Sequence, residues 1–340
     1  MKKILWVLLF TGITHSCTSQ KNLTSEDYEK ALPDYYATIT AEDLSKHLYI
    51  FASDEFEGRD SGEPGQKKAA NYIRDFYKKT GISSPKSPYV DNHFQKIPAG
   101  TFDRIKNDTE NVLGFIIGSE KPEEILIISA HYDHVGMENG EIYNGADDDG
   151  SGSVALLEMA EAFKKAEKDG FKPKRSILFL HVTGEEKGLL GSKYYTDTQP
   201  VFPLENTIAD LNIDMIGRVD DKHQSNPHYV YLIGSDKLST ELHNLSEAVN
   251  QKYFNLQLDY TFNDESDPNR FYYRSDHYNF AKNNIPIIFY FNGVHEDYHQ
   301  PGDTPDKINY EILAKRTQLI FATAWELANG ENRPKVDKQP

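Results

Sequence analysis

Short apolar segments alternate with helical patterns from about residue 124 onward, and this alternation leaves the chain few possible architectures. The apolar segments lie at 125–129, 176–182, 208–214, 229–234, 256–260 and 286–291, and the helical patterns at 153–166, 238–253, 275–283 and near 310–328. Continuous apolar runs are typical of strands buried on both faces by helices. The sequence therefore predicts an α/β fold with a mixed, largely parallel central sheet sandwiched by helices.

Two helices are predicted before this alternation begins. Thr40 can cap a helix whose apolar residues Leu44, Leu48 and Phe51 recur at helical spacing. After the glycine-rich segment EGRDSGEPG, a second helix is expected to end near Gly81. The following stretch, 82–111, is rich in Pro, Asn and Lys, and we expect loop or edge strand there.

Histidines and carboxylates follow four of the predicted strands at their C-terminal ends. They are His131 in AHYDHVG, Glu185 and Glu186 in TGEEKG, Asp214 in NIDMIGR and His299 in DYHQPGDT. Open α/β sheets bind ligands at the carboxyl ends of their strands. We therefore expect these side chains to converge on one site.

Imidazole and carboxylate groups without a thiolate are suited to zinc at a hydrolytic site. Two histidines, one bridging carboxylate and two terminal carboxylates would supply each of two zinc ions with a histidine, a shared acid and one acid of its own. Two such ions about 3.5 to 4 Å apart can activate a shared water and polarise a carbonyl group. The residue set thus predicts peptide-bond hydrolysis.

With these motifs, the chain resembles the co-catalytic di-zinc aminopeptidase family. This family of zinc exopeptidases includes bacterial leucyl aminopeptidases, glutamate carboxypeptidase, glutaminyl cyclases and transferrin-receptor ectodomains. The similarity covers roughly residues 40–328 and includes FASDEFEGRDSGEPGQKKAANYI near its start. It implies a zinc-exopeptidase fold of the phosphorylase/hydrolase-like type and an aminopeptidase acting on peptide substrates with two Zn²⁺ per chain.

The resemblance also assigns the metal ligands. It implies that His131 and His299 each ligate one zinc and that Asp148, in NGADDDGSG, bridges the two ions. Glu186 and Asp214 match the terminal carboxylate ligands.

Three further roles come from the same resemblance. Glu185 matches the general base that accepts a proton from the attacking water. Asp133, two residues after His131, would orient the imidazole of that ligand. The peptide bond between Asp148 and Asp149 is expected to be cis.

Two other functions are compatible with much of this set. A single-zinc glutaminyl cyclase keeps several of the acids, but cyclases tend to have Trp before the final histidine, where this chain has Tyr298, and to lose the acidic GSG loop. A catalytically inactive binding protein would have lost ligands that are all present here. An EF-hand calcium loop is excluded, because the positions that would need acids are Gly145 and Leu156.

Several residues near the motifs lie outside the assigned ligand set. His134, His181, His277 and His295 lie outside the matching positions and are expected to be structural or surface histidines. Asp276 in SDHYNF is a candidate to support the ligands. An aromatic group could line a side-chain pocket, although such density is more typical of core: Phe271, Tyr272, Tyr273, Tyr290, Phe291 and Tyr298.

The N-terminus predicts export. Lys2 and Lys3 precede a short apolar run, so residues 1–16 are interpreted as a signal peptide. The single cysteine, Cys17, follows directly and is expected to be lipidated, which would anchor the protein to a membrane facing the periplasm or cell surface. We expect a tether over 17–38, the peptidase domain over 39–330 and a tail over 331–340.

The charge of the chain limits its partners. The formal net charge is −16, and no stripe of Lys or Arg interrupts it. Such a surface repels phosphate backbones, so no nucleic-acid partner is expected. The sequence predicts contact with a membrane only through the lipid anchor, and it leaves oligomeric state and the preferred N-terminal residue open.

Overall fold

The computed structural model describes residues 23–338 of the chain. The predicted signal peptide and Cys17 lie outside these residues. Within the described part, no helix has the length and apolarity needed to cross a membrane.

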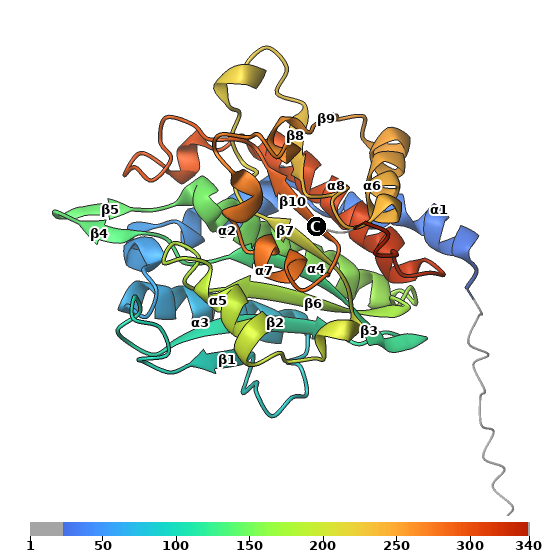
Figure 1. Cartoon of the computed structure of the whole chain (residues 1–340), viewed down its shortest axis with the longest axis horizontal. Coiled ribbons are helices and arrows are strands. Elements are labelled where there is room, and N and C mark those ends of the chain that lie inside the picture. The colour runs from blue at the N-terminus through green and yellow to red at the C-terminus, as the bar shows by residue number, and fades with distance from the viewer. Residues whose placement is uncertain (1–22, 339–340) are drawn as a thin grey trace, which may run out of the picture.

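An eight-stranded mixed sheet forms the centre of the molecule (Figure 1). Across the sheet, the strands are β1 (Phe94–Ile97), β2 (Thr109–Ile116), β6 (Arg175–Val182), β3 (Lys121–His131), β7 (Thr207–Ile213), β10 (Ile287–Phe291), β8 (Tyr229–Ile233) and β9 (Gln257–Asp259). The four central strands β6, β3, β7 and β10 are parallel to one another. Both β2 beside β6 and β8 beside β10 run antiparallel. The predicted mixed, largely parallel sheet is confirmed.

Helices cover both faces of this sheet, which explains why β6 and β7 are buried along their whole length. One face carries α1 (Ser25–Tyr36), α2 (Ala41–Phe51), α3 (Pro64–Thr80), α4 (Gly152–Lys168), α6 (Thr240–Tyr253) and α8 (Tyr310–Asn329). The other face carries the short helices α5 (Leu190–Lys193) and α7 (His277–Ala281) together with irregular segments. A small hairpin of β4 (Gly136–Glu138) and β5 (Glu141–Tyr143) lies apart from the sheet.

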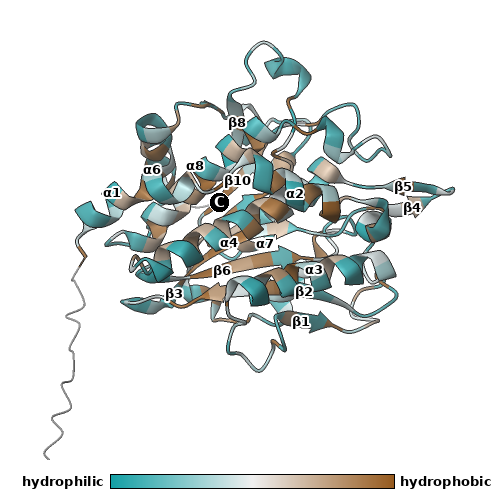
Figure 2. Cartoon of the chain, turned by 180° about the vertical axis from the view of Figure 1, so that it is seen from behind, coloured by the Kyte–Doolittle hydropathy of each residue, from teal (hydrophilic) through white to brown (hydrophobic). Residues whose placement is uncertain are grey.

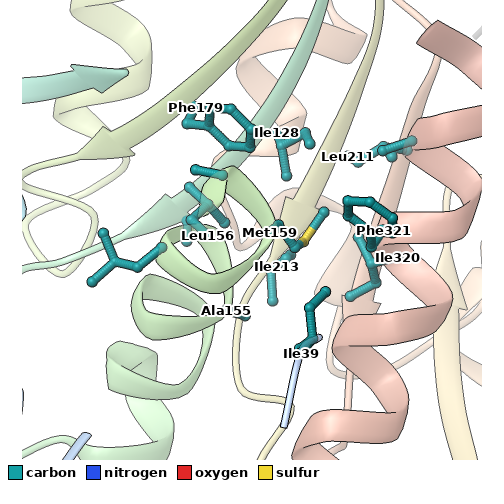
Figure 3. Packing of buried hydrophobic residues seen from close by; sticks show 14 of the residues in the cluster. Ile39, Ile128, Ala155, Leu156, Met159, Phe179, Leu211, Ile213, Ile320 and Phe321 are labelled. Carbon is teal, nitrogen blue, oxygen red and sulfur yellow. The ribbon is translucent and has the colours of Figure 1, made fainter. Parts of the chain in front are cut away.

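The main core lies between the sheet and the helices α4 and α8. Figure 3 shows Ile128, Phe179 and Leu211 of three neighbouring strands packing toward Met159 of α4 and Phe321 of α8. All five side chains are fully buried. Hydrophobic residues accordingly concentrate along β6 and α4 in Figure 2. This core holds the carboxyl ends of the central strands in place relative to one another.

The predicted start and end signals of the first helices are confirmed. The Thr40 side chain accepts a hydrogen bond from the Asp43 N–H at the start of α2. Gly81 adopts the left-handed conformation, with φ 81°, directly after α3. In the stretch expected to be loop or edge strand, β1 is an edge strand; the antiparallel β2, which begins at Thr109, was not predicted.

The prediction of a tether over 17–38 is wrong for residues 25–36, which form α1. Thr24 and Asp27 form a reciprocal capping box at its start. Leu32 and Tyr35 of this helix are buried, and Tyr35 stacks on Trp325 of α8 with ring centroids 5.4 Å apart. Tyr28, Leu32 and Tyr35 recur at helical spacing, a pattern that the polar residues between them obscure.

Candidate metal centre

The residues predicted to form the site meet at the carboxyl edge of the four parallel strands. His131 ends β3, Asp214 directly follows β7, and Glu185 and Glu186 follow β6. His299 lies in the loop after β10. After β3 the next strand of the sheet, β6, lies toward one edge of the sheet, whereas after β7 the next strand, β8, lies toward the other edge. Such a reversal opens a crevice between adjacent strands, and ligands bind there in open α/β sheets.

Asp148 lies between the two predicted histidine ligands. Its Oδ1 is 3.1 Å from Nε2 of His131, and its Oδ2 is 3.0 Å from Nε2 of His299. On one side, Oδ1 of Asp214 is 3.6 Å from Nε2 of His131. On the other, Oε2 of Glu186 is 3.1 Å from Nε2 of His299. We call His131 with Asp214 the inner half of the site and Glu186 with His299 the outer half.

Asp149 holds the surrounding backbone together, although it directly neighbours Asp148. Its carboxylate accepts hydrogen bonds from the N–H groups of His131, Gly152 and Met215 at 3.2, 2.9 and 3.0 Å. These groups belong to the end of β3, the start of α4 and the segment after β7. The peptide bond between Asp148 and Asp149 is cis, as the resemblance implied.

Two further residues position the loop that carries Asp148, and the sequence did not single them out. The Asp303 carboxylate accepts hydrogen bonds from the N–H groups of Asp147 and Asp148. The fully buried Arg59 donates to the carbonyl oxygens of Asn144 and Gly145, at 2.6 and 2.8 Å. Arg59 belongs to the glycine-rich EGRDSGEPG segment. Burial lowers the pKa of its guanidinium to about 10.

Asp133 orients His131 by a different atom from the one expected. The His131 ring Nδ1 lies 3.1 Å from the backbone carbonyl oxygen of Asp133, whereas the Asp133 Oδ1 is 3.9 Å away. The carboxylate instead accepts hydrogen bonds from the Ser61 hydroxyl and from the N–H of Glu185, at 2.7 and 3.2 Å. Asp133 therefore links the imidazole of one predicted ligand to the backbone of the predicted base.

The site carries a strong negative field. Burial alone would lower the pKa of His131, but the carboxylates of Glu185, Asp214 and Asp148 raise it well above its ordinary value. Burial likewise acts to lower the pKa of His299, whereas Asp148 and Glu186 raise it to about 10. Among residues 23–338, no Lys or Arg forms an ion pair with these site carboxylates. Such a field favours bound cations.

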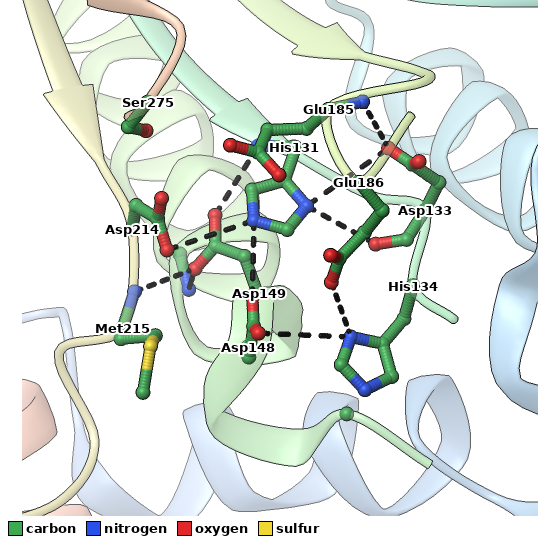
Figure 4. A network of polar contacts seen from close by, with 12 residues as sticks. His131, Asp133, His134, Asp148, Asp149, Glu185, Glu186, Asp214, Met215 and Ser275 are labelled. Carbon is green, nitrogen blue, oxygen red and sulfur yellow. Dashed lines mark hydrogen bonds and ion pairs between the residues drawn. The ribbon is translucent and has the colours of Figure 1, made fainter. Parts of the chain in front are cut away.

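The donor set matches a divalent metal. His131 Nε2, Asp148 Oδ2 and Glu186 Oε1 are buried but have no hydrogen-bond partner, a costly state unless another ligand satisfies them. The described chain contains two groups of three side chains whose possible ligand atoms lie within 4.8 Å of one another inside each group. The first group is His131, Glu185 and Asp214, and the second is His134, Asp148 and Glu186. Imidazole with carboxylate is a zinc-type donor set. Figure 4 shows most of these side chains pointing toward one another.

A small pocket opens beside this cluster. Asp148, Glu185, Asp214 and His299 lie on its polar side. Its other side is lined by Met215, Phe271, Phe289, Phe291, Val294 and Tyr298, with Arg274 also present. Of the six aromatic residues considered from the sequence, Phe271, Phe291 and Tyr298 thus line the pocket. Tyr290 is core on the opposite face of the sheet, and Tyr272 and Tyr273 lie in a separate surface hollow.

The remaining histidines divide into two kinds: in the described part of the chain, neither ring nitrogen of His134 or His295 has a hydrogen-bond partner, and His295 Nε2 lies 3.2 Å from Asp147 Oδ2, whereas His181 and His277 each have one. His181 contacts the Tyr77 hydroxyl at 2.7 Å and His277 contacts the Tyr272 carbonyl oxygen at 2.8 Å, as expected of structural histidines. Asp276 accepts a hydrogen bond from Ser192 on α5. His134 differs, because its Nδ1 lies 2.9 Å from Oε1 of Glu186 and joins the cluster. The sequence interpretation of His134 as a merely structural or surface residue overlooked this placement.

The structure thus places a cluster of imidazoles and carboxylates in a crevice at the carboxyl edge of the parallel strands. Residues 111–324 match Peptidase family M28, which covers more than half of the chain and includes every predicted ligand. The chain belongs to peptidase family M28. The resemblance to zinc aminopeptidases drawn from the sequence is confirmed.

Curated relatives agree with this membership. The chain is 29% identical to the aminopeptidase YwaD of Bacillus subtilis over 69% of this chain and 49% of the relative. It is 26% identical to a probable aminopeptidase of Saccharomyces cerevisiae, YDR415C, over 67% of this chain and 60% of that protein. The chain thus spans about half the length of the curated relatives it matches.

The fold is shared with solved aminopeptidase structures. The LapA aminopeptidase of Legionella pneumophila superposes with a TM-score of 0.69 at 19% identity, over 98% of this chain and 81% of the other. BSAP, a zinc aminopeptidase from Bacillus subtilis, gives a TM-score of 0.62 at 17% identity, over 87% of this chain and 98% of the other. At these identities the likeness shows the fold.

Proposed function

We propose that this protein is an exported aminopeptidase that removes N-terminal residues from peptides with the help of two zinc ions. The observation that carries the proposal is the position of Asp148, with one carboxylate oxygen beside each histidine. In this proposal Asp148 would bridge two ions. His131 and Asp214 would complete the inner half, and Glu186 and His299 the outer half.

Bound zinc would lower the pKa of a water molecule and polarise the substrate carbonyl group. Glu185 is the residue proposed to handle the proton. Its carboxyl group lies in the same group as His131 and Asp214 and also lines the pocket. In this proposal the Glu185 carboxylate would accept a proton from the attacking water and donate it to the departing amine.

The Glu185 backbone is held for this task. Its N–H donates to Asp133, whose backbone carbonyl oxygen contacts the His131 ring. The base and the first predicted ligand therefore share one support. This arrangement limits the movement of the carboxyl group relative to the inner half of the site.

The pocket supports a peptide N-terminus as the substrate. Glu185, which the proposal does not use as a metal ligand, leaves a carboxylate in the pocket that would favour the positively charged α-ammonium group of a free N-terminus. Phe271, Phe289, Phe291 and Met215 offer an apolar wall beside the predicted ligands, which suits an apolar N-terminal side chain. We therefore propose a preference for apolar over acidic N-terminal residues.

The test uses the full chain purified with zinc. We expect two zinc ions per chain by elemental analysis and hydrolysis of aminoacyl chromogenic substrates and unblocked dipeptides, both lost after chelation. Glu185→Gln should lower kcat by roughly 10²- to 10⁴-fold while zinc content is unchanged. Glu161→Gln, an exposed change on α4, is the matched control.

Other results would contradict the proposal in distinct ways. Retained turnover in Glu185→Gln would remove Glu185 from the base role. One zinc per chain with cyclisation of N-terminal glutamine would favour a glutaminyl cyclase, and a protein without zinc or turnover would favour an inactive binding scaffold.

Export and anchoring through Cys17 form part of the same proposal and are tested separately. Cell fractionation with radiolabelled fatty acid should place the label on the wild-type chain in the membrane fraction. Cys17→Ala should lose the label. A cytoplasmic, unlabelled wild-type protein would contradict this part while leaving the chemistry untouched.

A further inference from the structure

His134 occupies an unusual position for a histidine outside the predicted ligand set. It follows the end of β3 by three residues, and its side chain is completely buried. Neither ring nitrogen has a hydrogen-bond partner among the described residues. An imidazole buried in this way is costly unless one nitrogen meets another ligand.

The His134 ring faces the outer half of the site. Its Nδ1 lies 2.9 Å from Oε1 of Glu186 and 3.9 Å from Oδ2 of Asp148 (Figure 4). These two carboxylates are the same ones that contact His299, through Glu186 Oε2 and Asp148 Oδ2. The carboxylates of Glu186 and Asp148 and the ring of His299 therefore surround the space beside His134.

The contacts of His134 have the same character as those of His131. Nε2 of His131 lies 3.1 and 3.6 Å from oxygens of Asp148 and Asp214, yet it also lacks a hydrogen-bond partner. In both cases an imidazole nitrogen and carboxylate oxygens approach one another without forming a hydrogen bond. Metal ligands, whose donor atoms point to a shared neighbouring position rather than at each other, have this geometry.

The backbone around His134 prevents the ring from turning away. Gly145, with φ 54°, lies so close that a Cβ atom there would be 2.4 Å from the His134 ring. Arg59 holds the Gly145 carbonyl oxygen at 2.8 Å, and the His134 N–H donates to the Arg59 carbonyl oxygen at 3.2 Å. The ring is therefore fixed against the Asp148 loop in the orientation that faces Glu186.

We infer that His134 is a sixth metal-ligating side chain, binding the cation of the outer half through Nδ1. This inference rests on the proposed metal centre. The outer half would then have Asp148, Glu186, His299 and His134, whereas the inner half would have Asp148, Asp214 and His131. The extra imidazole is buried, whereas the side chain of His299 is 38% exposed. It would keep the outer cation bound when His299 moves.

The first test is a crystal structure of the wild-type chain loaded with zinc. Direct ligation predicts a distance of about 2.0 to 2.1 Å between His134 Nδ1 and the outer zinc. A separation above 3 Å, with the Nδ1–H group donating to Glu186 instead, would overturn the inference. This measurement requires no substitution and does not depend on turnover.

The second test separates ligation from simple positioning. The amide nitrogen of Asn can occupy the place of His134 Nδ1 and donate a hydrogen bond to Glu186, but it is a poor zinc ligand. We expect His134→Asn and His134→Ala both to weaken binding of one of the two zinc ions by at least about tenfold in chelator-competition titrations. The buried His181→Asn, which removes an imidazole from the contact with Tyr77, is the matched control and should leave both zinc affinities unchanged.

The outcomes distinguish this inference from the proposed function. If His134→Asn keeps wild-type affinity for both zinc ions while the wild-type chain binds two and hydrolyses peptides, only the role of His134 fails. If the wild-type chain binds no zinc, the proposed metal centre and this inference fail together.

Discussion

The inner and outer halves of the site share Asp148 but are held by different parts of the fold. His131 belongs to β3 and is 1% exposed, and Asp214 directly follows β7. His299 lies in a loop, its side chain is 38% exposed and its φ of 54° is left-handed. The inner ligands therefore move only with the buried sheet, whereas the outer histidine depends on local loop contacts such as its stacking on Tyr298.

This difference predicts that the fold would hold the two proposed ion sites unequally. Side chains at the ends of central strands are pre-positioned by core packing, so little conformational freedom is lost when a cation binds. A ligand on an exposed loop must lose more freedom on binding. We therefore expect His131 to contribute more to zinc binding in the inner half than His299 contributes in the outer half.

The largest effect is expected from Asp148→Ala, which removes the carboxylate that contacts both histidines. Both halves should lose zinc, and kcat/KM should fall by on the order of 10³-fold or more, because the activated water and the polarised carbonyl are lost together. Elemental analysis and steady-state kinetics check this result, with the exposed Asp221→Ala as control. Zinc retained in one half at wild-type affinity would show that the two halves are independent.

A comparison of His131→Ala with His299→Ala tests the inequality directly. We expect His131→Ala to reduce zinc affinity in its half by about 100-fold or more, and His299→Ala to have a smaller effect in the other half. Zinc release into excess chelator from the wild-type chain should show a fast phase that His299→Ala accelerates. A larger loss of affinity in His299→Ala would reverse the proposed order.

Asp149→Ala tests how the inner half is supported. The substitution leaves the buried N–H groups of His131, Gly152 and Met215 without their acceptor. We expect the free energy of unfolding to fall by about 2 to 4 kcal/mol. Urea unfolding in the presence of chelator measures this without a contribution from metal binding. Asp34→Ala, on the exposed side of α1, should change stability little, and equal effects in both variants would contradict the bracing role of Asp149.

The last effect, which depends on pH, concerns Asp210 of β7, behind the inner half. Burial raises the pKa of this carboxyl well above its ordinary value, and Ser129 donates to it at 2.8 Å. Because the folded pKa lies above the unfolded pKa, the carboxyl stabilises the fold at pH below the unfolded value. That stability is lost as the pH rises toward the folded pKa, by at most about 1.4 kcal/mol per pH unit.

Asp210→Asn should therefore flatten this dependence. We expect the variant to gain stability relative to wild type as the pH rises from 4 to 8, measured by urea unfolding with chelator present. A difference that is independent of pH, or that shrinks toward pH 8, would contradict the raised pKa.

The sequence by itself determined the central parallel strands, the main helices α2, α3, α4, α6 and α8, and most of the residues that meet at the site. Apolar runs mark strands that are buried on both faces. His131 and Asp214 come at the ends of such runs, so the local pattern already places them at the carboxyl edge of the sheet. The sequence could also mark His299 and the Glu185–Glu186 pair, because each follows a strand of the same sheet.

Only the tertiary structure decided which loop atoms act and in which direction. The local sequence does not distinguish the bracing role of Asp149 from the central position of Asp148, and it does not reveal that His131 contacts the carbonyl oxygen of Asp133. It also does not reveal that His134 lies beside Glu186 or that α1 packs against Trp325. Side chains in irregular segments take their direction from distant partners such as Arg59 and Asp303. Those partners come close only when the whole chain has folded.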